Sequence, residues 1–320
     1  MTPDVSVVMP LRNAERYVYQ AVRSVLDQTF ESLELIVVDD GSTDGSRQRV
    51  AEAADDRVRI VDGPVDGIAR ALNRGLEEAR GSILCRCDAD DLYLPGRLET
   101  QVRWLKAHPE FGAVCGRMVS LDVSGRKVAE LDCGGSEETE ITEGLLRGEA
   151  VTSLCTFAVR AEVMRKTGGC RPYFVVASDV DLQFRIAEAG RVGYLPEAVY
   201  AYRVHDGSHV HVSDDGARRF YDDMARSFAL QRREGGRDDL QKGTPPPVPE
   251  TGRMARPAQH QIASQLNGRA WRLHGEGNKK EALRAGWAAC RKDPWRLKRW
   301  MSLVALLIKP SKGGFGGPIG

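Results

Sequence analysis

Three aspartates crowd the segment Asp88-Ala89-Asp90-Asp91, which closely follows a short buried strand predicted at residues 82–86. Like charges this close repel one another unless a cation or hydrogen-bond donors neutralise them. Carboxylates at this spacing suit a hard divalent ion, which takes oxygen ligands and also binds phosphate oxygens. The plainer alternative is an aspartate-rich cap before the helix predicted at residues 96–108. These residues alone leave both interpretations open.

Two further acidic positions carry the same ambiguity. Asp39 and Asp40 end the apolar run 33–38 and open a turn of glycine and short polar residues. Asp179 begins a helix predicted at residues 179–189. Each of these carboxylates could simply cap a helix. Because ligands bind beyond the carboxyl ends of strands in open α/β sheets, we also expect the strand-end aspartates to face a ligand.

The elements that would position these carboxylates alternate along the N-terminal part of the chain. Short β-branched runs predict buried strands, and apolar residues at a 3.6 period predict helices. We expect strands at 5–10, 33–38, 57–61 and 82–86, and helices at 16–28, up to about 54, 68–79 and 96–108. This alternation is typical of an α/β fold with a doubly wound, mostly parallel sheet.

The rest of the chain is less regular. We expect strands at 112–116, 154–159, 191–195 and 200–204, and helices at 141–146, 179–189 and 214–233. Beyond a segment rich in proline and glycine, helices are predicted at 261–273, 278–291 and 294–308. The first two resemble one helical hairpin of the tetratricopeptide kind, which cannot bury its faces alone. The sequence therefore predicts a C-terminal α-helical appendage that docks on the main domain or on a partner.

Composition excludes several classes of protein. With 42% hydrophobic and 28% charged residues in 320, the chain can form a sizeable core, and a net charge of +1 argues against nucleic acid as a partner. The seven cysteines are scattered without a zinc-binding pattern, so we expect reduced, buried thiols. We expect neither a signal peptide nor a spanning helix, and hence a cytoplasmic location.

Membrane association on the cytoplasmic face is an alternative suggested by one segment. Residues 295–300 alternate aromatic, basic and apolar side chains and lead into an apolar half-helix ending at Ile308. This composition is typical of a helix lying in a membrane interface. A helix packed on the main domain is the plainer and slightly favoured interpretation.

Taken in order, these motifs resemble the inverting glycosyltransferases of family 2, which have the type A fold of nucleotide-diphospho-sugar transferases. The resemblance covers about residues 3–212 and rests on the ordered set, since each piece alone is weak. The matching residues are 5–10, Asn13, 37–44, 88–91, 95–99, 178–182 with Arg185, and 202–208. The helical appendage lies outside it.

The resemblance implies a role for each candidate site residue. Asp179 would be the general base. The nucleotide sugar would be bound by Pro10, Asn13, Asp39, Asp40, Arg70 and Asp88. A divalent metal, Mn²⁺ or Mg²⁺, would be held by Asp90 with help from Asp91, and His205 falls where some relatives place a further metal or phosphate contact. A structural hydrogen bond is an equally good interpretation of His205.

The resemblance also implies a domain organisation. Residues 1–234 would form the glycosyltransferase domain, with the nucleotide-sugar-binding half at about 1–116 and the acceptor and base half at about 117–234. A linker would follow at 235–255, then the helical tail at 256–310 and a disordered end at 311–320.

The implied activity is metal-dependent, inverting transfer of a hexosyl or related sugar from a nucleotide diphosphate sugar, with a UDP-sugar favoured. The acceptor would be a hydroxyl of a glycan, glycolipid or protein, as in polysaccharide or other glycoconjugate synthesis. One departure stands out, because the family usually has an acidic residue before the base and this chain has Ser178. A catalytically degenerate nucleotide-sugar-binding or scaffold protein is therefore the alternative. A nucleotidyltransferase is disfavoured, because no glycine-rich loop follows the first strand.

Overall fold

The structure is a computed structural model that describes residues 2–131, 135–149, 152–207, 215–249 and 257–310. Contacts divide the chain into two units. The first comprises Met1–Met118, Asp132–Tyr202 and Asp214–Gly252, and the second Val119–Leu131, Arg203–Ser213 and Arg253–Gly320. This division differs from the predicted one, because two inner segments group with the C-terminal helices. The predicted disordered end and residues 250–255 of the predicted linker lie outside the described residues.

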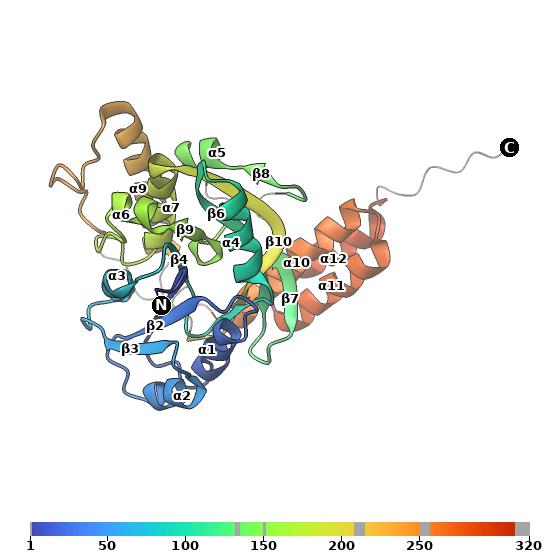
Figure 1. Cartoon of the computed structure of the whole chain (residues 1–320). Coiled ribbons are helices and arrows are strands. Elements are labelled where there is room, and N and C mark those ends of the chain that lie inside the picture. The colour runs from blue at the N-terminus through green and yellow to red at the C-terminus, as the bar shows by residue number, and fades with distance from the viewer. Residues whose placement is uncertain (1, 132–134, 150–151, 208–214, 250–256, 311–320) are drawn as a thin grey trace. The chain divides into compact units, whose positions relative to one another are not determined.

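Four parallel strands form one half of the sheet in the first unit, in the order β3-β2-β1-β4. They are β1 (Val5–Leu11), β2 (Leu33–Asp39), β3 (Val58–Asp62) and β4 (Ile83–Arg86), joined through α1 (Val18–Leu26), α2 (Ser46–Ala53) and α3 (Ile68–Glu78) (Figure 1). Most of these strands and helices begin and end within two residues of their predicted bounds. The parallel half of the α/β fold is therefore confirmed.

Mixed pairing completes the sheet, which continues from β4 through β9, β6 and β10 to β5. These strands are β9 (Ala158–Arg160), β6 (Phe111–Leu121), β10 (Arg191–Arg203) and β5 (Leu92–Tyr93), and β8 (Thr139–Glu140) pairs with β10. The helices here are α4 (Arg97–Ala107), α5 (Thr142–Leu146), α6 (Ala161–Thr167), α7 (Ser178–Ala189) and α9 (Asp215–Gly235).

Two strand predictions were wrong in detail. The predicted strand 154–159 begins as a 3₁₀ turn, Leu154–Thr156, whose start is capped by the Ser153 side chain, and only then becomes β9. The predicted strands 191–195 and 200–204 are one strand, β10. Pro196 lies between the residues that pair with β8 and those that pair with β5, so its missing N–H interrupts neither of these two ladders.

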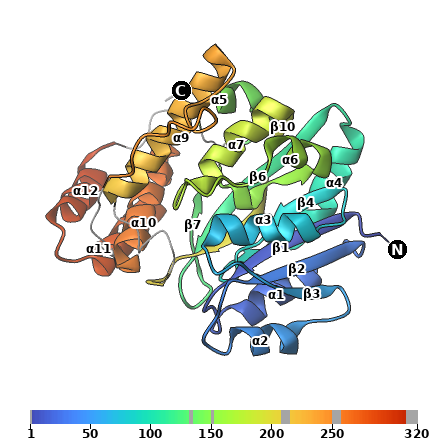
Figure 2. The ribbon, with the colours of Figure 1, turned by 90° about the vertical axis from the view of Figure 1, so that its left-hand side faces the viewer.

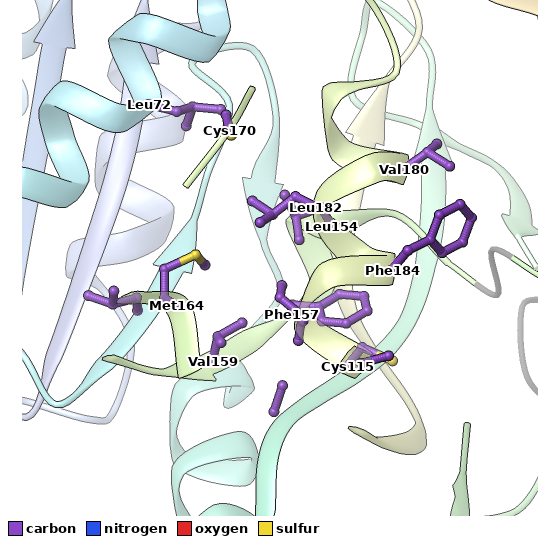
Figure 3. Packing of buried hydrophobic residues seen from close by; sticks show 14 of the residues in the cluster. Leu72, Cys115, Leu154, Phe157, Val159, Met164, Cys170, Val180, Leu182 and Phe184 are labelled. Atoms are coloured by element: carbon purple, nitrogen blue, oxygen red, sulfur yellow. The ribbon is translucent and has the colours of Figure 1, made fainter. Parts of the chain in front are cut away.

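Helices on both faces of the sheet bury two hydrophobic clusters, as a doubly wound fold requires. Along β1, Val7 and Met9 enter one cluster with α1 and α4, whereas Val8 enters the other. In that second cluster α3 lies over β1 and β2 (Figure 2), and residues of α7 such as Leu182 pack beside Phe157 and Leu154 (Figure 3). A cavity of about 30 Å³ lies there, lined mainly by apolar side chains and by Arg86.

The predicted linker does not begin at residue 235. Asp238 is fully buried in the first unit and forms ion pairs with Arg171 and Arg232. A buried carboxylate with two guanidinium partners holds the segment that follows α9 against the core. The first part of the predicted linker is therefore ordered structure.

The second unit contains the three C-terminal helices α10 (Ala258–Gly275), α11 (Lys279–Lys292) and α12 (Leu297–Ile308), close to their predicted ranges. Ala270, Ala285 and Leu306 form the hydrophobic core of this unit, and the small alanine side chains allow the helices to pack closely. Guanidinium groups of α10 donate to carbonyls of β7 (Lys127–Leu131), from Arg269 to Val128 and from Arg272 to Glu130. The predicted helical pair, α10 and α11, thus packs against α12 and β7. Throughout the described ranges, no helix has both the length and the apolar character needed to cross a bilayer.

Candidate active site

The two acidic segments come together at one edge of the parallel half of the sheet. Strand β1 lies between β2 and β4, with Leu11 opposite Asp39 and Val8 opposite Arg86. The backbone N–H of Asp40 donates to the Leu11 carbonyl at 2.8 Å. The carboxyl ends of these three parallel strands therefore share an edge, which is where ligands bind in such sheets.

Asp40 holds the loop that leads into α3. Its Oδ1 accepts a hydrogen bond from the Val65 N–H at 2.7 Å, and its Oδ2 accepts one from the Gly67 N–H at 3.1 Å. The Arg12 guanidinium lies 3.9 Å from Oδ2. Val65 and Gly67 both have positive φ, 57° and 86°, and a β-branched residue rarely adopts that conformation. Backbone strain of this kind clusters at functional sites, which supports a role for this edge.

Asn13 and Asp39 join the loops that follow β1 and β2. The Asn13 side-chain oxygen accepts from the Thr43 N–H at 2.8 Å, and its own N–H donates to Ser42 Oγ at 3.1 Å. Asp39 Oδ1 accepts from the Ser42 N–H at 3.0 Å. At the start of α2, Asp44 accepts from the Ser46 N–H. Helix capping therefore does not account for Asp39 and Asp40.

Pro10 and Arg70 are the remaining candidates for nucleotide binding. Pro10 is partly buried near the end of β1, opposite Val38 of β2. Arg70 lies in the first turn of α3, half exposed, with its Nε 2.6 Å from Asp66. Both belong to segments that end or begin at the same sheet edge, and their roles stay predictions.

Arg86, which had no evident partner in the sequence, pairs with Asp88 two residues later. Its Nε donates to Asp88 Oδ1 at 2.6 Å and its Nη2 to Oδ2 at 3.0 Å. The Cys155 thiol lies 3.4 Å from Oδ2. Burial alone would lower the pKa of Arg86, but the charges of Asp88 and also of Asp179 raise it well above its ordinary value. Asp88 and Asp179 thus act on the same guanidinium.

Asp90 and Asp91 occupy different environments. Asp90 is partly exposed, whereas Asp91 is buried and its Oδ2 accepts a hydrogen bond from the Tyr200 hydroxyl at 2.8 Å. The same hydroxyl accepts from the Asp88 N–H at 3.0 Å. Burial, aided by the charge of Asp91, raises the pKa of Tyr200 well above its ordinary value, so the phenol stays protonated. Tyr200 therefore braces the turn that presents Asp90.

Asp179 lies in the first turn of α7, a helix that begins directly after a strained residue. Ala177 has φ 61°, a left-handed conformation that alanine rarely adopts, and Ser178 is buried at the first helical position. Burial raises the pKa of Asp222 on α9, and the charge of Asp179 adds to that rise. No sequence motif indicated Asp222, because its link to Asp179 arises only from the packing of α9 against α7.

The predicted metal ligands suit a cation that takes its remaining ligands from the enzyme's substrate and from water. Within the described ranges, no three His, Cys, Asp or Glu residues are grouped to hold a metal by themselves. Mg²⁺ and similar ions bind one or two carboxylates together with phosphate oxygens and water, so a partly exposed Asp90 suits them. His205 belongs to the second unit. Its assignment, like those of Asp90 and Asp91, stays a prediction.

Comparison with known proteins decides the family. The family model described as "Glycosyl transferase family 2" matches residues 6–168. The putative glycosyltransferase EpsE of Bacillus subtilis is 33% identical over 210 residues, which cover 63% of this chain and 73% of EpsE. The chain belongs to glycosyl transferase family 2. It is a glycosyltransferase by its sequence relationship to this family.

Solved structures resemble this glycosyltransferase over nearly its whole length. Staphylococcus aureus TarS 1–349, in a complex with UDP-GlcNAc, has a TM-score of 0.61 at 18% identity and covers 95% of this chain and 87% of that one. The mannosyltransferase PcManGT of Pyrobaculum calidifontis, in complex with GDP-Man and Mn²⁺, has a TM-score of 0.53 at 22% identity and covers 97% and 87%. At such identities the likeness concerns the fold, and it confirms the predicted type A architecture.

A buried charge network holds the glycosyltransferase helix that carries Asp179. Asp181, fully buried on α7, accepts from Arg171 Nε at 2.9 Å and from Arg185 Nη2 at 2.7 Å. Arg171 also donates to Asp238 at 2.6 Å, and Arg232 pairs with Asp238 as well. The resemblance included Asp181 and Arg185. Arg171 and Asp238 were missed, because they lie in segments without a recognisable motif.

Replacing Tyr200 with phenylalanine tests the brace behind Asp90. We expect Tyr200→Phe to lower the free energy of unfolding by about 2–3 kcal/mol, since the buried Asp91 carboxylate loses a hydrogen-bond donor. Tyr93→Phe is the matched control, because the buried Tyr93 hydroxyl donates only to the neutral Arg86 carbonyl, at 2.9 Å. Its expected cost is about 1 kcal/mol. Equal losses in urea unfolding would contradict the proposed brace.

Proposed function

We propose that this glycosyltransferase moves a sugar from a nucleotide diphosphate sugar to an acceptor hydroxyl, with inversion and with a divalent metal. The observation that carries the proposal is that β1 lies between β2 and β4, so Asp39, Asp40 and Asp88 follow adjacent parallel strands, while Asp179 lies at the start of the separate helix α7. A site for the donor at the strand ends and a carboxylate from a separate helix are what a single displacement requires.

In this proposal Asp179 is the general base. It takes the proton of the acceptor hydroxyl as that oxygen attacks the anomeric carbon from the face opposite the departing diphosphate. One carboxylate then suffices, whereas retention by double displacement needs a second one as nucleophile. Ser178 replaces the usual neighbouring acid, and Asp222 supplies another carboxylate near Asp179 from a different element.

The donor would lie along the strand-end loops. Asp90, with Asp91 behind it, would hold Mn²⁺ or Mg²⁺, which supplies a Lewis acid for the negative charge of the departing diphosphate. Pro10, Asn13, Asp39, Asp40, Arg70 and Asp88 would contact the nucleotide. The Mn²⁺ bound to PcManGT supports the metal assignment by fold likeness.

A UDP-sugar is the favoured donor. TarS was solved with UDP-GlcNAc and PcManGT with GDP-Man, so the fold accommodates either base. Both oxygens of Asp40 already accept a backbone N–H, yet each carboxylate oxygen keeps a further lone pair for a uracil imide. The acceptor would be a glycan, glycolipid or protein hydroxyl, in polysaccharide or related synthesis on the cytoplasmic side. Nucleic acid is not expected as a partner.

Metal-dependent donor binding tests the proposal. We expect UDP or GDP to raise the melting temperature by several degrees with Mn²⁺ and little with EDTA, because saturation at a hundred Kd stabilises by about 2.7 kcal/mol. Asp90→Asn should lose the metal-dependent part of the shift. Asp62→Asn is the control, since Asp62 also ends a parallel strand but lies in an exposed ion pair with Arg47.

If no nucleotide diphosphate gave a metal-dependent shift, the proposal would fail. Binding without transfer to any acceptor, unchanged by substitution of Asp179, would instead favour the degenerate binding protein. A screen of nucleotide sugars by the same thermal shift would then identify the preferred donor.

A further inference from the structure

Helix α12 exposes an apolar face. Leu297, Met301, Val304 and Ile308 follow a helical spacing that puts them on one side of the helix. Leu297 is 71% exposed, Met301 62% and Ile308 76%. Apolar side chains gathered on one exposed face mark a surface that binds something, whereas single exposed apolar residues need no explanation.

This face is not the one that holds α12 in its own unit. On the opposite side Leu306 is fully buried, and Ser302 Oγ accepts from Trp271 Nε1 of α10 at 2.7 Å. Arg299 Nε donates to the buried Asp293 at 2.8 Å. The packed side of the helix is thus complete, and the exposed face is a second surface.

The charges beside the exposed face indicate what it binds. Every charged residue in the segment 294–310 is basic, and no acidic residue interrupts it. Arg296 and Lys298 are exposed on either side of Leu297, and Trp295, just before the helix, is 95% exposed. Exposed tryptophan, basic residues and an apolar stripe are the composition of helices that lie in the surface of anionic membranes.

A second copy of the chain fits this face less well. A two-fold interface brings the same patch of both copies together, so it would oppose basic residues with no acid between them. The length of α12 also suits a surface position. Its 12 residues extend about 18 Å, well short of the roughly 30 Å hydrocarbon core.

We propose that the exposed face of α12 binds the surface of an anionic lipid bilayer. The apolar stripe enters the boundary between headgroups and acyl chains, while Arg296 and Lys298 contact the lipid phosphates. This inference goes beyond the proposed transfer reaction and does not depend on which sugar is moved.

Vesicle flotation of the full chain tests this assignment. We expect binding to vesicles of phosphatidylcholine with phosphatidylglycerol, weaker binding to phosphatidylcholine alone, and a decrease with added salt. Leu297→Glu combined with Ile308→Glu should lower the partition coefficient about tenfold or more. Val248→Glu is the matched control, because Val248 is an exposed apolar residue, 47% accessible, outside the helix.

Two further variants separate the apolar and the charged contributions. Met301→Ser with Val304→Ser removes apolar area without adding charge, and it should weaken binding to both kinds of vesicle. Arg296→Gln with Lys298→Gln should weaken binding to the anionic vesicles roughly thirtyfold, with little effect on neutral ones. All of these positions are exposed or half-exposed, so the variants should keep the melting temperature of the wild type.

Three results would overturn the proposal. The first is an absence of binding to either kind of vesicle, and the second is equal binding by Leu297→Glu/Ile308→Glu and wild type. The third is a concentration-dependent dimer in lipid-free sedimentation that the same variant abolishes, which would assign the face to a contact between copies.

Discussion

Asp179→Asn is expected to lower kcat by about two to four orders of magnitude while leaving donor binding unchanged. The amide keeps the size of the carboxylate but cannot accept the acceptor's proton. Asp179 is partly exposed in the first turn of α7, and its charge contributes to the raised pKa values of Arg86 and Asp222. The helix itself should persist, because Asp181 anchors it independently.

The measurement needs two readouts on the same protein. Transfer is followed with the donor found by thermal shift, and donor affinity is followed by the Mn²⁺-dependent shift itself. Asp223→Asn is the matched control, because Asp223 is 71% exposed on α9 and pairs only loosely with Arg226, at 3.6 Å. Full activity in Asp179→Asn would disprove the assignment of the base. Loss of donor binding as well would mean that Asp179 has a structural role.

The second large effect concerns stability. Asp238→Asn should lower the free energy of unfolding by about 3–5 kcal/mol at pH 7, because Arg171 and Arg232 lose their shared buried partner. Asp238 is fully buried and lies in a segment that sequence alone assigned to a linker. Urea unfolding measures the loss, and Asp223→Asn serves again as the exposed control with an expected change within about 0.5 kcal/mol.

The pH dependence gives this prediction a second test. Burial alone would raise the pKa of Asp238, but hydrogen bonds from the Gln241 N–H and from the two guanidinium groups lower it below its ordinary value. A lowered folded-state pKa means that the carboxylate stabilises the fold above its unfolded pKa, about 3.9. The stabilisation is lost as the pH falls through the folded-state pKa. The difference between wild type and Asp238→Asn should therefore shrink below about pH 4, and a constant difference would contradict the ionic origin.

Much of the fold could be predicted because its signals are local. The runs at 5–10, 33–38 and 82–86 are short and mainly apolar, and burial on both faces of a parallel sheet explains that composition. The helices of the appendage could be predicted from their periodicity, and α12 matched its range within a few residues at each end. Local signals failed at the 3₁₀ turn Leu154–Thr156, where the Thr156 carbonyl accepts a hydrogen bond from Gln101 of α4 at 2.7 Å.

The sequence by itself determined the chemical identity of the site: carboxylates at two strand ends and at one helix start, in an order that indicates the family. Only the tertiary structure decided the partners. Asp88 neutralises Arg86, Tyr200 braces Asp91, and Arg171 joins Asp181 to Asp238. Two of these pairs, Tyr200–Asp91 and Arg171–Asp238, join residues far apart in the chain. Their energies come from burial and charge in a shared low-dielectric interior, which exists only once the chain has folded.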